Sequence, residues 1–390
     1  MLMLLCGACG SEGGGGEDPT PTPTPDKPDV KSPSTLEIHV YTPEHPVVTR
    51  AETDEVEPEE DEMAVNTLDI WVYVAEAKGS LQVGDLVGHL SPSISASSSS
   101  SASSFVGSYQ MTVSEEFAEQ KPKVDVYVAV NKASTGIASL IPTATATQLK
   151  EAVISGSNFG LTSPVTTPPT AGLPMSGVLK SQTIDDSSVP LLKVNTPVKV
   201  VRAVSKVRFV FTRTDTGAAD ELRITGININ SGIIPKKECL FLDAEYTAGS
   251  YKIDKTDESP YESAGALSPL TARAGNVPVS TYPAQYAYTD QDGQTYETLI
   301  NGGITSGDLA QVGRFYLRES DQQVTGTIQY TIGSSETKTA VFSMTGEKDF
   351  TRNHTWIVYG YFAGKENLKV YSIDVTDWRE STADYPVYNW

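Results

Sequence analysis

Residues 67–74 read TLDIWVYV and residues 123–130 read KVDVYVAV, two runs made mostly of β-branched and aromatic side chains. This composition is typical of strands that cover a hydrophobic core. Leu36, Ile38 and Val40 alternate with polar residues, which is the pattern of a half-buried strand. Similar runs, separated by turns rich in Gly, Pro and Ser, recur at 197–213, 223–230, 282–288 and within 313–375. We therefore expect an all-β fold built from β-sandwiches.

The length of the chain indicates more than one core. A chain of 390 residues is too long for one ordinary core and suits two β domains. A turn near residues 195–198 precedes a fresh strand pattern, so we place an N-terminal sandwich at 34–197 and a C-terminal sandwich at 198–390. Residues 147–154 are the best candidate for a short helix.

The chain is strongly acidic, with a formal net charge of −20. Such a charge repels phosphate backbones, so we expect no nucleic-acid partner. Eight of the acidic residues lie in one run from Glu52 to Glu62. The simplest interpretation of that run is a solvated, extended segment, and we assign residues 51–65 to an acidic linker.

The N-terminal residues resemble the end of a lipoprotein signal. Residues 1–8 are apolar and end in small residues, and Gly7 and Ala8 precede Cys9 as in a bacterial lipobox. We therefore expect a signal at 1–9, lipidation at Cys9 and a flexible Gly- and Thr-Pro-rich tether at 10–33. This predicts export through the cell envelope and anchoring to a membrane by the lipid. The alternative is an ordinary signal peptide with an incidental cysteine.

No set of residues in the sequence has the spacing of a catalytic or metal site. The four histidines are not near one another at metal-ligand spacing, and Cys239 is the only cysteine beyond the leader. We expect no enzyme activity, no cofactor and no metal. Tyrosines at 282, 286, 288 and 296 could line a glycan-binding face, although one face of a strand is the simpler interpretation.

Several short motifs follow one another in a recognisable order. They are a leader followed by a single strand at 34–41 and the junction Arg50-Ala51, the strand 66–74, LPMSG at 173–177, VRAVSKV at 201–207, and RNHTW at 352–356 with a strand and an aromatic tail after it. In this order the chain resembles the FimA/Mfa-type fimbrillins of Bacteroidetes, the subunits of type V pili. The long acidic stretch after Arg50 and the incomplete signal are less typical of that family.

The resemblance implies two tandem transthyretin-like β-sandwiches and polymerisation by strand exchange. Residues 34–50 would be a removable pro-strand whose Leu36, Ile38 and Val40 fill a groove at the edge of a sheet. An arginine-specific or trypsin-like protease would cut between Arg50 and Ala51. A donor tail at 377–390 would then enter the groove of another subunit; its anchors are Trp378, Tyr385, Val387, Tyr388 and Trp390.

Two features of this mechanism have simpler interpretations. Arg50 could be an ordinary exposed arginine, and the tail could pack as an edge strand on its own domain. Pro386 would limit the tail to edge pairing, because proline donates no ladder hydrogen bond.

The function expected is therefore that of a structural pilin subunit of a fimbria on the outer membrane and cell surface, of the shaft class. Its partners would be other fimbrial subunits in a homo- or heteropolymer, a processing protease, the membrane before cleavage, and a host or bacterial surface ligand. The alternatives are a tip or anchor subunit of the fimbria, or a monomeric surface lipoprotein that binds glycan or host protein.

Overall fold

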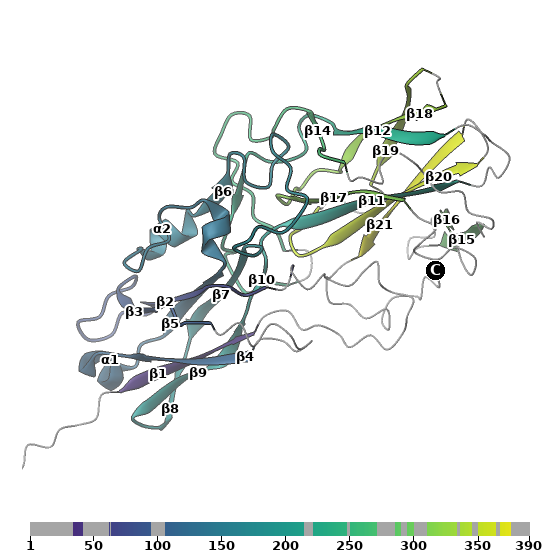
Figure 1. The fold of residues 1–390 in the computed structure, drawn as a ribbon. Helices are drawn as coiled ribbons and strands as arrows, with labels where there is room; N and C mark the ends of the chain where they lie inside the picture. The colour runs from purple at the N-terminus through teal and green to yellow at the C-terminus, as the bar shows by residue number, and fades with distance from the viewer. Residues whose placement is uncertain are drawn as a thin grey trace, which may run out of the picture. The chain divides into compact units, whose positions relative to one another are not determined.

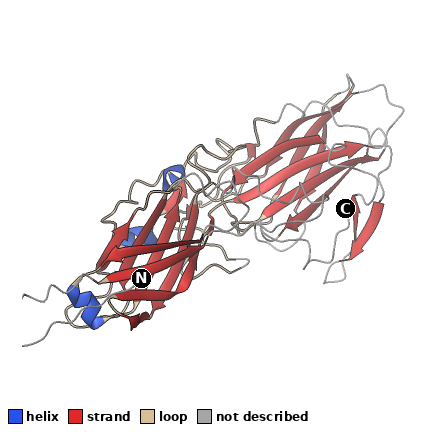
Figure 2. Cartoon of the chain, turned by 60° about the horizontal axis from the view of Figure 1, so that its bottom comes forward, coloured by secondary structure: helices blue, strands red, loops and turns tan. Residues whose placement is uncertain are grey.

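Strands make up nearly all of the regular structure, as Figure 2 shows. The computed structural model describes residues 34–41, 62, 64–94, 106–213, 221–247, 250–270, 285–289, 295–299, 310–333, 336–344, 350–363 and 367–375. All of them belong to one compact unit, residues 33–390. The all-β class expected from the sequence is confirmed.

The first half of the chain forms two sheets that share one core, with strand orders β4-β1-β9-β8 and β10-β7-β5-β2-β3 (Figure 1). Apolar side chains from both sheets meet between them, which makes this pair a sandwich. The strands are β1 Thr35–Tyr41, β2 Leu68–Val74, β3 Leu86–Leu90, β4 Val106–Thr112, β5 Val124–Val130, β7 Met175–Gln182, β8 Ile184–Ser188, β9 Leu191–Lys199 and β10 Val201–Arg202.

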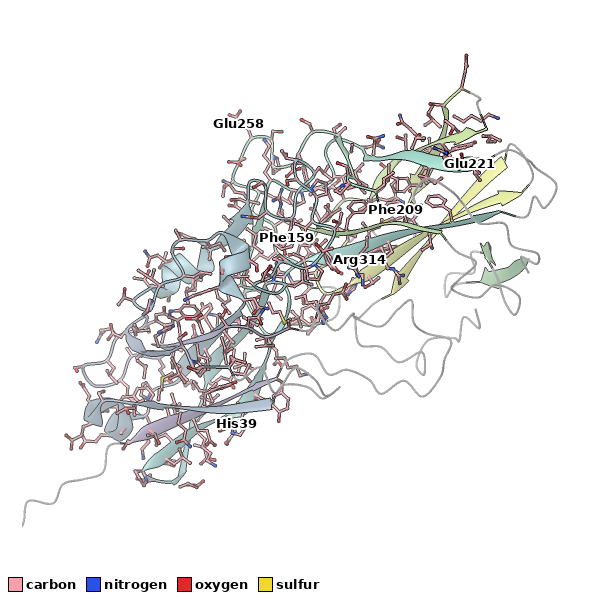
Figure 3. The ribbon with its side chains drawn as sticks, in the orientation of Figure 1. His39, Phe159, Phe209, Glu221, Glu258 and Arg314 are labelled. Atoms are coloured by element: carbon pink, nitrogen blue, oxygen red, sulfur yellow. The ribbon has the colours of Figure 1, made fainter. Side chains whose placement is uncertain are left out.

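The second half repeats this arrangement with the orders β17-β11-β20-β21 and β14-β12-β18-β19. Phe209 is fully buried in the core of this half and contacts Phe315 and Phe342 edge-on, with ring centroids 6.2 Å and 5.4 Å away (Figure 3). The strands are β11 Ser205–Arg213, β12 Leu222–Ile229, β14 Gly265–Ala266, β17 Ala310–Leu317, β18 Thr325–Ile332, β19 Lys338–Ser343, β20 Thr355–Ala363 and β21 Asn367–Val375. Strands β15 Gln285–Thr289 and β16 Thr295–Leu299 pair with each other in a two-stranded sheet.

Among the described elements, helices α1, Glu115–Gln120, and α2, Ala146–Lys150, and the 3-10 helix Lys132–Thr135 accompany the sheets. Helix α1 is capped by Ser114, and α2 by a capping box at Thr145. The helix expected at 147–154 therefore exists but ends at Lys150. The chain turns there into β6, Val153–Ser155, which pairs with β13, Lys237–Cys239, from the second half. A partner distant in sequence thus decides where the helix stops.

A third apolar cluster explains why β2 has no exposed face. Leu68, Ile70 and Val72 point into the first sandwich, while Trp71 and Tyr73 point away from it into this cluster. The indole nitrogen of Trp71 donates to the carbonyl of Ile141, 2.9 Å away. The cluster also contains residues of the second half, including Phe241 and Tyr316, so the two halves share apolar contacts.

The chain passes from the first pair of sheets to the second later than the sequence suggested. Strand β9 runs through residues 197 and 198, and β10 still pairs with β7. The first strand of the second pair is β11, so the crossing lies between Arg202 and Ser205. The run 197–213, which reads as one long strand, is broken because Ala203 N bonds back to Pro174 O, 2.8 Å away.

Candidate functional site

The expected pro-strand is part of the first sandwich. Strand β1 pairs antiparallel with β4 and parallel with β9, and it lies between them in Figure 1. Leu36, Ile38 and Val40 are each fully buried in the core. On a rough scale of 1.5–3 kcal/mol for each buried aliphatic side chain, these three residues contribute several kcal/mol to the sandwich.

β1 is an inner strand, whereas an edge strand was expected from the sequence. Its backbone is bonded on both sides: Thr35 N donates to Pro190 O at 3.1 Å, and Ser34 O accepts from Val113 N at 3.1 Å. Alternation of apolar and polar residues identifies a strand and its buried face, but it does not specify which strands lie beside it. The place of β1 in the sheet order could therefore not be predicted from the sequence. Removing β1 would leave unpaired backbone groups on two strands and not on one.

The outer face of β1 carries a charged cluster that its sequence pattern does not reveal. Glu37 is in register with Gln110 on β4 and with Lys193 on β9. Its carboxylate accepts from Gln110 Nε2 at 3.0 Å, lies 3.1 Å from His39 Nε2 and lies 3.5 Å from Lys193 Nζ. The hydrogen bonds from Gln110 and His39, together with the charge of Lys193, lower the pKa of Glu37 to about 2. The surroundings of Glu37 therefore favour its ionised form. Figure 3 labels His39, which contributes to this cluster.

The interpretation of the acidic run as a solvated segment is wrong for its last residue, Glu62. Its side chain is fully buried, its Oε1 lies 2.6 Å from Lys206 Nζ, and the hydroxyl of Tyr316 donates to the same oxygen. Arg202 Nε donates to the backbone carbonyl of Glu62 at 3.1 Å. Arg202 and Lys206 come from the VRAVSKV motif, so that motif supplies the positive charge that holds this carboxylate. Burial lowers the pKa of Lys206 to about 8, although Glu62 opposes the shift.

The remaining predicted site residues lie outside the described part of the chain. These are Cys9, Arg50, Ala51 and the tail residues Trp378, Tyr385, Val387, Tyr388 and Trp390. The candidate cleavage junction lies between β1 and Glu62 in the sequence. Cleavage there would thus separate β1 from a residue that is fixed in the body of the protein.

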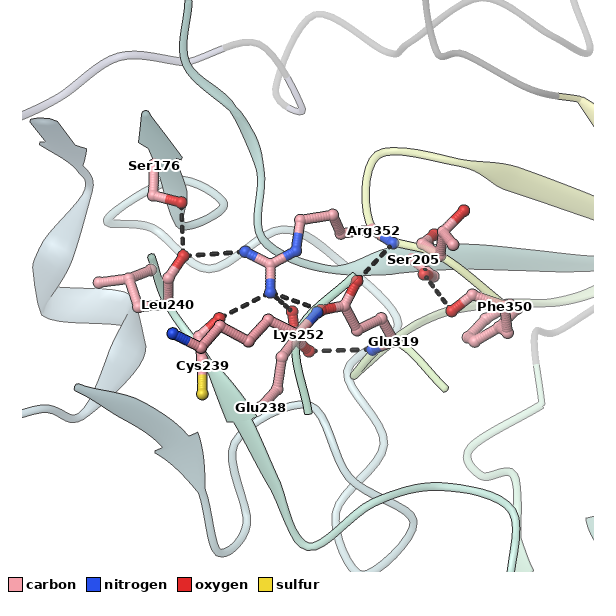
Figure 4. A network of polar contacts seen from close by, with 10 residues as sticks. Ser176, Ser205, Glu238, Cys239, Leu240, Lys252, Glu319, Phe350 and Arg352 are labelled. Carbon is pink, nitrogen blue, oxygen red and sulfur yellow. Dashed lines mark hydrogen bonds and ion pairs between the residues drawn. The ribbon is translucent and has the colours of Figure 1, made fainter. Parts of the chain in front are cut away.

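The RNHTW motif contributes to a buried polar network of the second half, which meets the first half at Leu240 (Figure 4). Arg352 Nη2 lies 2.5 Å from Glu319 Oε1 and 3.2 Å from Glu238 Oε1, and all three side chains are fully buried. Burial, and then the neighbouring Glu319 carboxylate, raise the pKa of Glu238 well above its usual range. Arg352 also donates to the carbonyl oxygens of Leu240 and Cys239, at 2.8 Å and 2.6 Å. These contacts fix the loop after β13 against the start of β20.

The LPMSG motif meets the same network from the first half. Ser176 Oγ donates to the Leu240 carbonyl at 2.5 Å (Figure 4). A Cβ at Gly177 would lie 2.5 Å from the carbonyl oxygen of Lys199, so only glycine fits at this close strand crossing. LPMSG and RNHTW, two of the motifs that carried the resemblance, therefore have structural roles at the junction.

Within the described ranges, His, Cys, Asp and Glu side chains form no cluster suited to a metal ion. In the same part of the chain, no helix combines the length and the apolar character needed to cross a membrane. Cys239 is buried and free.

The fold is also found in proteins of Bacteroidetes. A candidate cell adhesion protein from Parabacteroides distasonis matches with a TM-score of 0.50 and 14% identity, over 88% of this chain and 96% of that chain. The tip fimbrial protein Mfa3 from Porphyromonas gingivalis matches with a TM-score of 0.47 and 11% identity, over 89% and 100%. A fimbrial assembly protein from Parabacteroides distasonis gives 0.46 and 11%, over 88% and 97%.

At these identities the likeness concerns the fold, and the first match carries it. The sequence matches no family profile and no curated protein. This chain therefore shares its β-sandwich fold with a candidate cell adhesion protein from Parabacteroides distasonis.

Proposed function

We propose that this chain is a non-enzymatic subunit of a bacterial surface fimbria and that it polymerises when a protease frees β1. The observation that carries the proposal is the placement of β1: an inner strand with three fully buried side chains, joined to the rest of the chain through a segment that contains Arg50. Loss of such a strand opens an apolar groove between β4 and β9. A strand from a second subunit can close it with the same backbone bonds.

Three further observations support this proposal. The structures that share the fold include proteins named for cell adhesion and for fimbriae. The leader resembles a lipobox at Cys9, which would hold the unprocessed form at the outer membrane until cleavage. Glu62 is anchored in the body, so cleavage after Arg50 would release β1 and the lipid while the new N-terminal segment stays attached.

Strand donation of this kind is head-to-tail and builds an open filament. A chain with both a removable strand and a donor tail suits the shaft, where each subunit receives one strand and gives one. A tip subunit would receive a strand without giving one, and an anchor would keep its lipid.

The test is to treat the full chain with an arginine-specific protease and to follow size and N-terminal sequence. We expect a new N-terminus at Ala51, followed by a ladder of polymers and by filaments in electron micrographs. The variant Arg50→Gln should stay monomeric, whereas Arg223→Gln, at an exposed position of β12, should behave like the unaltered chain. Clean cleavage at Arg50 that leaves only monomers would contradict the proposal and would favour a monomeric surface binding protein.

A further inference from the structure

The segment that contains β1 has a counterpart near the end of the sequence. Residues 34–41 read STLEIHVY and residues 381–388 read STADYPVY. Ser, Thr, Val and Tyr are identical at the first, second, seventh and eighth positions, and the fourth position is acidic in both segments, Glu37 in one and Asp384 in the other.

Resting on the proposed function, we infer that residues 381–388 of one subunit replace β1 of another in this fixed register, and that Gln110 and Lys193 select the incoming strand by binding Asp384. The occupant of the groove is thus a second copy of this chain, and the polar face of the groove determines which segment enters and in which register.

Departure of β1 would leave two of its polar contacts behind. Glu37 and His39 would depart with β1, but Gln110 and Lys193 belong to β4 and β9 and would stay. The groove would then present an amide donor and an ammonium group that both now contact one carboxylate. An acidic residue at the same position of the incoming strand restores these contacts.

The apolar positions of the groove favour the same register. In the alignment, Ala383, Tyr385 and Val387 take the core positions of Leu36, Ile38 and Val40. A slip by one residue would turn Asp384 into the core, where a lone charge is costly. A slip by two residues in one direction brings Ser381 into the core, and a slip by two in the other brings Asn389. Only the aligned register fills all three positions with apolar side chains.

The proline of the tail is compatible with this register. Pro386 would occupy the position of His39, and a proline disfavours an inner strand. The register of β1 with β9 shifts between Ile38 and Val40, so that His39 alone among the residues of β1 has no partner residue on β9. Proline is tolerated at such irregularities of a sheet. The alignment therefore places Pro386 at the one position of the strand where the pairing is already irregular.

The test is a charge exchange in the full chain, cleaved with an arginine-specific protease and followed by the rate of polymer formation. We expect Asp384→Lys to slow assembly by about tenfold or more, because it places like charges side by side. Adding Lys193→Glu to Asp384→Lys should restore most of the rate. The matched controls are Asp377→Lys, in the tail but outside the aligned segment, and Lys150→Glu, at an exposed position of α2 away from the groove; each should assemble at nearly the unaltered rate.

A synthetic peptide of residues 381–390 provides a second measurement that does not depend on the folding of a variant. It should block assembly of the unaltered cleaved chain, and the same peptide with Asp384→Lys should need about tenfold more to do so. If the unaltered chain does not polymerise, the proposed function itself fails. If it polymerises but Asp384→Lys equals Asp377→Lys, or if Lys193→Glu restores nothing, the register and its selection are overturned while the proposed function stands.

Discussion

At the scale of the residue, acidic side chains at two positions show how burial changes what a charge does. The sequence of the run from Glu52 to Glu62 indicates a charged segment in solvent, yet the last residue of the run, Glu62, is buried against Lys206 and Tyr316. Glu37 stands in a strand of alternating residues, where an acid normally faces water, and there it joins three strands of one sheet through Gln110 and Lys193. Both carboxylates connect segments that are far apart in the sequence.

Glu37 predicts how stability depends on pH. Its pKa in the folded protein is about 2, below the ordinary 4.5, so the unfolded chain binds more protons between these values. The stabilisation by Glu37 is therefore complete above about pH 4.5 and is lost as the pH falls toward 2. We expect Glu37→Gln to flatten the fall in unfolding free energy over this range, measured by denaturant titration at a series of pH values.

The control for this measurement is Glu221→Gln, which removes an exposed ion pair with Arg223 at the surface of the second half. An exposed pair of this kind contributes little, so the pH dependence should stay as in the unaltered protein. Equal pH profiles for Glu37→Gln and the unaltered chain would contradict the role assigned to the cluster on β1.

At the scale of the element, β1 has two faces with different functions. The inner face closes the core, and the outer face carries the charged contacts. Under the proposed exchange, the apolar side chains would hold the strand in place and the polar contacts would define its register.

Substitutions on the two faces of β1 should differ in cost. Ile38→Ala removes a fully buried side chain and should lower the unfolding free energy of the protein by about 2–5 kcal/mol. His39→Ala, on the neighbouring outward position with a side chain 37% exposed, should cost about 1 kcal/mol or less. Denaturant unfolding followed by tryptophan fluorescence measures both. Similar costs for the two variants would show that β1 is not held by its inner face.

At the scale of the whole molecule, the two halves are joined by more than the connection after Arg202. Strand β6 of the first half pairs with β13 of the second. Arg318 donates to the carbonyl oxygens of Gly156 and Asn158, at 3.2 Å and 2.5 Å. Together with the Arg352 network and the shared apolar cluster, these contacts predict that the two halves unfold as one unit.

The variant Arg352→Met tests this coupling. It leaves Glu238 and Glu319 buried without the guanidinium they share, which should cost about 3–5 kcal/mol. We expect calorimetry to show two separate transitions where the unaltered chain shows one. Arg223→Met, which removes only an exposed contact, should keep the single transition. A single unshifted transition for Arg352→Met would show that the network does not couple the halves.

The sequence by itself determined the strands and their buried faces. TLDIWVYV and KVDVYVAV became β2 and β5, and the alternation of Leu36, Ile38 and Val40 indicated the face of β1 that lies in the core. This information is local, because the period of two and the preference for β-branched residues act within a few neighbouring residues.

Only the tertiary structure decided that β1 lies inside its sheet and that Glu62 is buried. The tertiary structure also decided that the helix expected at 147–154 stops at Lys150, and that the chain crosses to the second pair of sheets after Arg202. In each case the deciding partner is distant in sequence: β9 for β1, Lys206 for Glu62, and β13 for the strand that follows the helix. No local pattern encodes such a pairing, because its free energy arises only when the two segments meet.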